Sequence, residues 1–196
     1  MCARRERRDR DYLVKLLNTN RTLVAADRRR TGASGAIVHR VQTLAQQLDT
    51  KAPFDGWNGI ASGLFEGEPE MRVEDFDRLS ALRQWVDSGD WPTEEPNTRS
   101  AYDRFRSALG AFLEFFIEKS HLWPGPGLLR ITAKPPDAGW VSDDTYLKFA
   151  AALKQNCQRL DVLFGDLTNA ANSLIWQIQS DVDATFRAGA LDLKSQ

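Results

Sequence analysis

The apolar positions of this chain recur mostly at the three- and four-residue spacing of amphipathic helices. The clearest run lies near the end of the chain, where apolar or small residues alternate in steps of four and three from Tyr146 to Ile178. Two further steps of four extend the run, and Ser142 stands before it as a helix N-cap residue, followed by two aspartates that suit the helix dipole. This pattern predicts one long helix over residues 142–188.

Helical spacing also predicts shorter helices earlier in the chain. Leu13, Leu17 and Val24 share one face, with Asn20 on the same seam, which indicates a helix over about residues 5–30. The segments predicted after it are a glycine-containing break at 31–35, an amphipathic helix around 37–48, a helix over 73–88 capped by Gly89, and a largely buried helix from about residue 100 to 117.

Prolines and glycines interrupt the helical pattern in the remaining stretches. Residues 51–72 mix several of them with scattered apolar side chains, which predicts an irregular loop. Residues 123–127 read Trp-Pro-Gly-Pro-Gly and predict a turn, because proline lacks a backbone donor and disfavours helical geometry in the residue before it. Residues 128–133 predict a short extended piece as a minor element.

These elements together predict an all-α fold, an elongated antiparallel helical bundle with a long C-terminal helix and irregular loops that contain Trp, Pro and Gly. The C-terminal helix would be about 70 Å long at 1.5 Å per residue, and an apolar seam of that length needs a partner along most of it. Helices near the N-terminus have comparable length, although a homodimer seam would give the same pattern. We expect one helical domain over residues 1–196, with 1–10 as a flexible basic arm.

Composition agrees with a globular protein that buries one sizeable core. The chain has 196 residues, of which 42% are hydrophobic and 27% charged. The first residues are charged, and no apolar stretch approaches the ~20 residues of a membrane span, so we expect a cytoplasmic protein. Cys2 and Cys157 lack the spacing of a metal knuckle or a redox pair. Because Cys157 falls on the C-terminal seam, we expect it in the core.

Charge is spread unevenly, and this asymmetry provides the first functional hypothesis. Residues 1–30 hold ten basic and four acidic side chains, a net charge of +6, which leaves −7 for the rest of the chain. A basic arm of this kind suits the phosphates of a nucleic acid, with affinity that falls as salt rises, or it pairs with the acidic body. An anionic membrane surface is the least favoured ligand. The candidate anion-binding residues are Arg4, Arg5, Arg7, Arg8, Arg10, Arg28, Arg29 and Arg30.

Tryptophans provide the second hypothesis. The chain has six of them, and four fall in the predicted loops: Trp57, Trp91, Trp123 and Trp140. Such residues anchor long loops onto a bundle, which is the favoured interpretation, and they are also enriched at binding hot spots. These four are therefore the candidate partner-binding residues.

The sequence offers no catalytic constellation. Glu118 and His121 match one half of the Glu-x-x-His pairs that build di-iron sites in helical bundles, but the second half is missing, since Ala36 stands three residues before His39. We therefore predict no catalytic residue, metal, cofactor or small-molecule ligand. The expected function is that of a non-enzymatic helical interaction or scaffold subunit in a larger complex or homo-oligomer. The alternative is a helical nucleic-acid-binding protein that uses the arginine arm.

Overall fold

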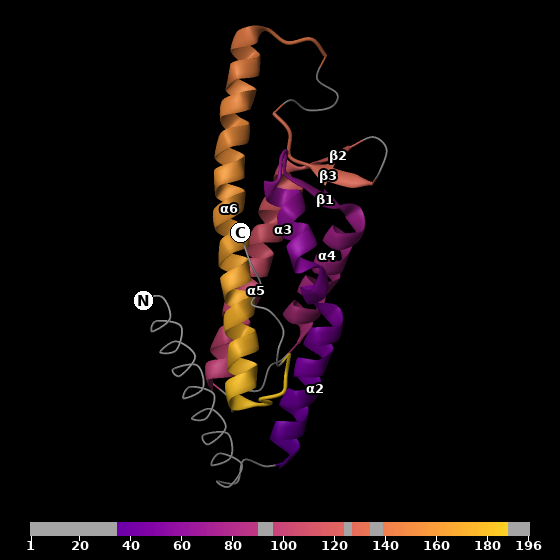
Figure 1. Ribbon diagram of the computed structural model, residues 1–196, viewed down its shortest axis with the longest axis vertical. Coiled ribbons are helices and arrows are strands. Elements are labelled where there is room, and N and C mark those ends of the chain that lie inside the picture. Colours follow the sequence, from indigo (N-terminus) through magenta and orange to yellow (C-terminus); the bar gives the residue numbers. More distant parts are fainter. Residues whose placement is uncertain (1–34, 90–95, 124–126, 134–138, 188–196) are drawn as a thin grey trace, which may run out of the picture.

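The protein is mostly helical, as predicted, with one small sheet (Figure 1). The computed structural model describes residues 35–89, 96–123, 127–133 and 139–187. Its helices are α2 (Gly35–Lys51), α3 (Trp57–Phe65), α4 (Val73–Ser88), α5 (Pro96–Lys119) and α6 (Asp143–Asp181). A 3-10 turn, η1 (Phe54–Gly56), precedes α3, and the strands are β1 (Glu70–Arg72), β2 (His121–Trp123) and β3 (Leu128–Arg130).

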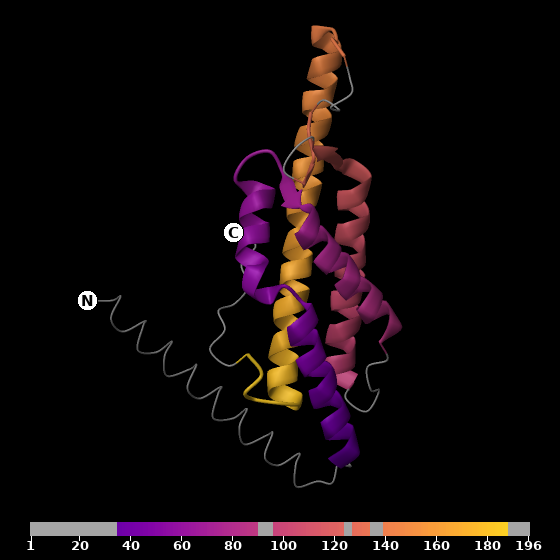
Figure 2. The ribbon, with the colours of Figure 1, turned by 90° about the vertical axis from the view of Figure 1, so that its right-hand side faces the viewer.

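Helix α6 is the longest element, and α5 packs along its lower half in the opposite direction (Figures 1 and 2). Thr98, near the start of α5, donates a hydrogen bond to the Asp181 carboxylate at the end of α6 (3.2 Å). At the middle of α6 the Phe164 ring contacts the rings of Phe112 and Trp57, with centroids 5.5 and 5.4 Å apart. These contacts join α3, α5 and α6 in one aromatic core.

A polar contact inside this core fixes the position of α3. The indole N–H of Trp57 donates a hydrogen bond to the Thr168 hydroxyl (3.1 Å), and both side chains are buried. A buried donor without an acceptor would cost about 1 to 3 kcal/mol. The pair therefore holds α3 against α6 in one register.

Three short antiparallel strands form a small sheet in the order β1-β3-β2, beside which α6 continues upward (Figure 1). Met71 and Leu129 pair across β1 and β3, and both are buried. The extended piece predicted over residues 128–133 is confirmed in β3. Its partners β1 and β2 were not predicted, because a three-residue strand is too short to show an alternating pattern.

The predicted loop over residues 51–72 is wrong, since this stretch contains η1, α3 and β1. Trp57, Ile60, Ala61 and Leu64 form a buried helical face, and the intervening glycines concealed its periodicity. Gly63 has a specific role, because a Cβ atom there would lie 2.8 Å from the backbone oxygen of Glu70. Glycine thus lets α3 approach β1 closely, at a cost in helix propensity of about 1 kcal/mol.

The two long helices differ from prediction at their ends. Helix α5 starts at Pro96 and not near residue 100, because the first helical position needs no backbone donor and suits proline. Helix α6 starts as predicted, and the Ser142 hydroxyl accepts a hydrogen bond from the Thr145 amide (3.4 Å). It ends at Asp181, earlier than the predicted residue 188, and the chain turns there so that Val182 and Phe186 are still buried.

The segment after α6 is fixed by Arg187. Its guanidinium pairs with the carboxylates of Asp49 and Asp55 and lies 5.1 Å from the centroid of the Phe54 ring. Burial alone would lower the pKa of Arg187, but the two carboxylates raise it. The end of the described chain is therefore attached to α2 and η1.

The predicted helices at 37–48 and 73–88 are confirmed as α2 and α4, with Gly89 at the C-cap of α4. The predicted helix over 5–30 and the start of the break at 31–35 lie outside the described residues. Within the described part of the chain, no helix is both long and apolar enough to cross a membrane.

Candidate interaction surface

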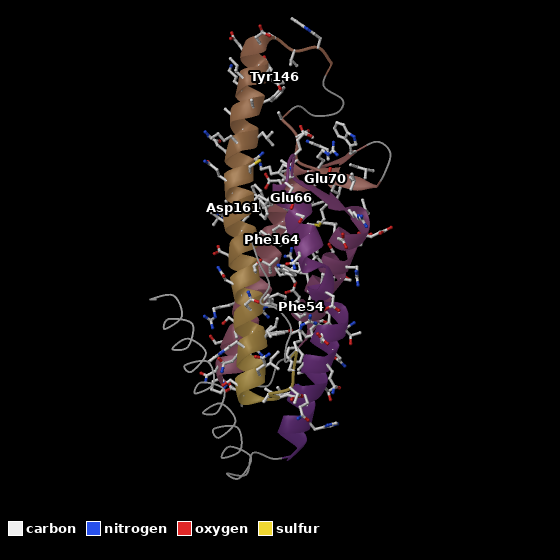
Figure 3. All side chains as sticks on the ribbon, viewed as in Figure 1. Phe54, Glu66, Glu70, Tyr146, Asp161 and Phe164 are labelled. Carbon is white, nitrogen blue, oxygen red and sulfur yellow. The ribbon has the colours of Figure 1, made fainter. Side chains whose placement is uncertain are left out.

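The upper part of α6 extends beyond the rest of the molecule (Figures 1 and 2). Its first buried residue is Leu160, so none of the seventeen residues from Asp143 to Arg159 is fully buried, and among them only the partly buried Leu153 packs against the core of the described chain. Figure 3 shows Tyr146 near the upper end of this projection, above Glu66 and Glu70 at the sheet. We call residues 143–159 the projecting segment.

Exposed apolar side chains gather on α6 and the residues before it. Of the seven large hydrophobic residues that are exposed in the described chain, five fall between residues 140 and 176. Their exposed fractions are 91% for Trp140, 52% for Tyr146, 65% for Leu147, 51% for Val162 and 44% for Trp176. Helix α6 therefore carries four of the seven exposed large hydrophobic residues of the described chain, and Trp140 lies just before it.

Several of these residues share the face of α6 that points away from the core. Steps of three, four or seven residues keep a helical position on one face. The outer stripe, as we call this face, consists of Leu147, Ala151, Gln158, Val162, Gly165, Asn169 and Trp176. Six of these seven residues are exposed, and Gly165 is half-buried.

Gly165 makes the outer stripe hollow at its centre. A Cβ atom built on Gly165 would meet no other atom within 4 Å, so neither packing nor backbone geometry in the described structure requires glycine there. Glycine in a helix interior costs about 1 kcal/mol relative to alanine. No contact within the described chain therefore accounts for the loss of helix stability that Gly165 causes.

A groove runs beside the lower half of the outer stripe, between α5 and α6, and many of the residues that line it are charged or hydroxyl-bearing. Its walls on α6 include Asp166, Asn169 and Ser173. Its walls on α5 include Arg99 and Asp103, whose side chains form an ion pair (3.0 Å), and Arg104, Ser100 and Ser107 lie nearby. The groove and the outer stripe are continuous, since Asn169 belongs to both.

Two charged residues flank the outer stripe on the side of this groove. Arg159 and Asp166 are both exposed and lie two helical turns apart on α6. Neither has a salt bridge within the described part of the chain. A positive and a negative side chain are thus available for a partner.

The structure separates the tryptophans that were candidates for partner binding. Trp57 is 1% exposed and starts α3, so it anchors α3 in the core and does not lie in a loop. Trp123 ends β2 and is half-buried, with the guanidinium of Arg130 4.7 Å from its ring centroid. Trp140 alone is almost fully exposed, and Trp91 lies outside the described residues.

The arginine arm lies entirely outside the described residues, so the structure does not place Arg4, Arg5, Arg7, Arg8, Arg10, Arg28, Arg29 or Arg30. Its proposed anion binding stays a prediction from the sequence. The surface on α6 was not among the predicted site residues. A period-seven pattern of exposed residues opposite the core seam could have indicated it, but polar members such as Gln158 conceal that pattern.

The half-motif for a di-iron site is not completed among the described residues. No group of three or more His, Cys, Asp and Glu side chains in them could hold a metal ion. The Glu118 carboxylate pairs with Lys119 (2.7 Å), while His121 begins β2. The prediction that Cys157 lies in the core is wrong, because it belongs to the projecting segment and is only half-buried. Partial burial raises the pKa of its thiol.

Comparisons with known proteins provide no family for this chain. A scan against protein-family models finds no match, and searches of curated proteins and of solved structures find no significant similarity.

Proposed function

We propose that the protein is a non-enzymatic helical interaction subunit, built as an elongated antiparallel bundle, that associates with other protein chains through α6. The observation that carries this proposal is the concentration of exposed large hydrophobic side chains of the described residues on α6 and just before it: four of seven lie on α6, and Trp140 lies three residues before its start. Exposed apolar surface that is contiguous marks association sites in soluble proteins. A helix that projects from its own core is also sterically accessible along its length.

The chemistry of the surface supports a protein partner. Trp140 and Tyr146 each combine a large apolar ring with a polar group, and both residue types are enriched at the energetic centres of protein interfaces. Asp143 and Asp144 at the upper end of α6 are negatively charged, which disfavours an anionic membrane or a nucleic acid at this end. A folded protein surface fits both properties.

Chemical cross-linking in cells of the native source tests this proposal. Lys148 and Lys154 lie on the projecting segment and should form cross-links to other protein chains. Lys119, at the end of α5, is the matched control lysine and should form fewer. Val162→Glu places a charge on the outer stripe without touching the core and should abolish the cross-links from α6. A strictly monomeric protein whose α6 lysines form no intermolecular cross-links would refute the proposal.

A further inference from the structure

We infer that the partner of α6 is a second copy of this chain, whose α6 lies antiparallel along the outer stripe. This inference rests on the proposed function and names its partner. It explains three features that the single chain leaves unexplained: the projecting segment, the hollow at Gly165, and the separate charges of Arg159 and Asp166.

Size complementarity fixes the register. We place the two α6 helices antiparallel, related by a twofold axis that passes midway between residues 163 and 164. A residue of one copy then lies at the same height along the helices as the residue of the other copy whose number, added to its own, gives 327. Val162 then faces Gly165 of the second copy, and Ala151 faces Trp176 of the second copy. Large side chains meet small ones at both positions, as in well-packed helix interfaces. Gln158 faces Asn169 of the second copy, which permits a hydrogen bond between two amides.

Charge complementarity supports the same register. A twofold axis perpendicular to the helices places each flank of the stripe opposite the same flank of the other copy. Arg159 and Asp166 share the flank next to α5, and their numbers add to 325, so they lie within about 3 Å of the same height. Each Arg159 therefore reaches Asp166 of the second copy, and symmetry creates this ion pair twice.

The lengths agree as well. The projecting segment has seventeen residues and is about 25 Å long at 1.5 Å per residue. In this register it lies beside residues 168–184 of the second copy, on the outer stripe that borders the groove between α5 and α6. The least buried part of each α6 is thus placed beside the lower half of its partner's α6, and the reverse holds for the other copy.

Charge reversal with rescue tests this arrangement by light scattering on the full-length chain over a wide concentration range. Arg159→Glu and Asp166→Arg should each weaken dimerisation about tenfold, because each replaces two attractive pairs by two repulsive ones. The double variant restores the attraction and should dimerise like the wild type. Arg78→Glu, an exposed charge reversal on α4, is the matched control and should leave dimerisation unchanged.

Gly165→Leu tests the size complementarity independently. The space above Gly165 is open in the single chain, so the variant should fold normally by circular dichroism and yet lose the dimer. A wild-type chain that stays monomeric at every concentration, or a double charge reversal that fails to restore the dimer, would overturn the inference. If α6 cross-links to a different protein while the chain itself stays monomeric, the inference fails and the proposed function stands.

Discussion

Replacing Thr168 by valine would leave a buried indole N–H group without its acceptor. Trp57 is 1% and Thr168 2% exposed, and the hydrogen bond between them measures 3.1 Å. Valine matches threonine in shape, so the substitution changes the hydrogen bond and leaves the packing nearly intact. An unsatisfied buried donor costs about 1 to 3 kcal/mol of unfolding free energy. For a chain of this size, each kcal/mol lowers the melting temperature by about 2 to 4 °C.

Urea unfolding followed by circular dichroism measures this loss, with Thr50→Val as the matched control. Thr50 is exposed on α2, and its hydroxyl bonds only to the Gln46 carbonyl one turn earlier, so its substitution should change the unfolding free energy by less than about 0.5 kcal/mol. Adding Trp57→Phe to Thr168→Val removes the orphan donor, and the double variant should lose less than the sum of the single losses. Equal effects of Thr168→Val and Thr50→Val would refute the account of how α3 is held.

Three further predictions concern stability. Gly63→Ala should destabilise the protein, because the new Cβ would lie 2.8 Å from a backbone oxygen. Gly59→Ala should instead stabilise α3 by about 0.5 to 1 kcal/mol, because a Cβ there would have nothing within 4 Å. Thermal melts in which Gly63→Ala is the more stable of the two variants would contradict this. Ser142→Ala should cost about 1 kcal/mol through the lost N-cap of α6, and an unchanged urea midpoint would count against the cap. Burial raises the pKa of Tyr102 to about 12 from 10, so the folded state favours the neutral phenol. The resulting contribution to the free energy of unfolding is fully present below pH 10 and is lost as the pH rises through 12. Urea midpoints measured against pH should therefore fall over this range in the wild type and fall less in Tyr102→Phe.

Sequence periodicity located the helices that have continuous apolar faces. The prediction of α2, α4 and the start of α6 succeeded because a cap residue or a regular three- and four-residue spacing marks each of them. Helix α3 was missed because it has only nine residues, and three glycines lie within it or next to it. One of them, Gly63, permits a close contact with β1 that exists only in the folded chain. Such tertiary contacts override local propensity and leave no local signal.

The candidate site was harder to predict, because burial and exposure depend on where the core ends. The seam from Tyr146 to Ile178 continues without interruption in the sequence, but in the described chain its residues are fully buried only from Leu160 onward. Sequence spacing therefore indicated that the seam needs a partner without showing which part lacks one. Likewise, Trp57 and Trp140 both seemed to be loop residues, and only the fold shows that one is buried and the other exposed.

A distance between two spin labels tests most directly whether two copies of the chain associate through antiparallel α6 helices. With both native cysteines replaced by serine, a single label at Lys148→Cys lies on the exposed part of the projecting segment. The antiparallel register separates the two labels of a dimer by about 45 to 50 Å, from 1.5 Å per residue along the helix. The account predicts one narrow distance in that range, which disappears in Gly165→Leu. A distance below about 20 Å, as in a parallel pair, or no dipolar coupling at any concentration would contradict it.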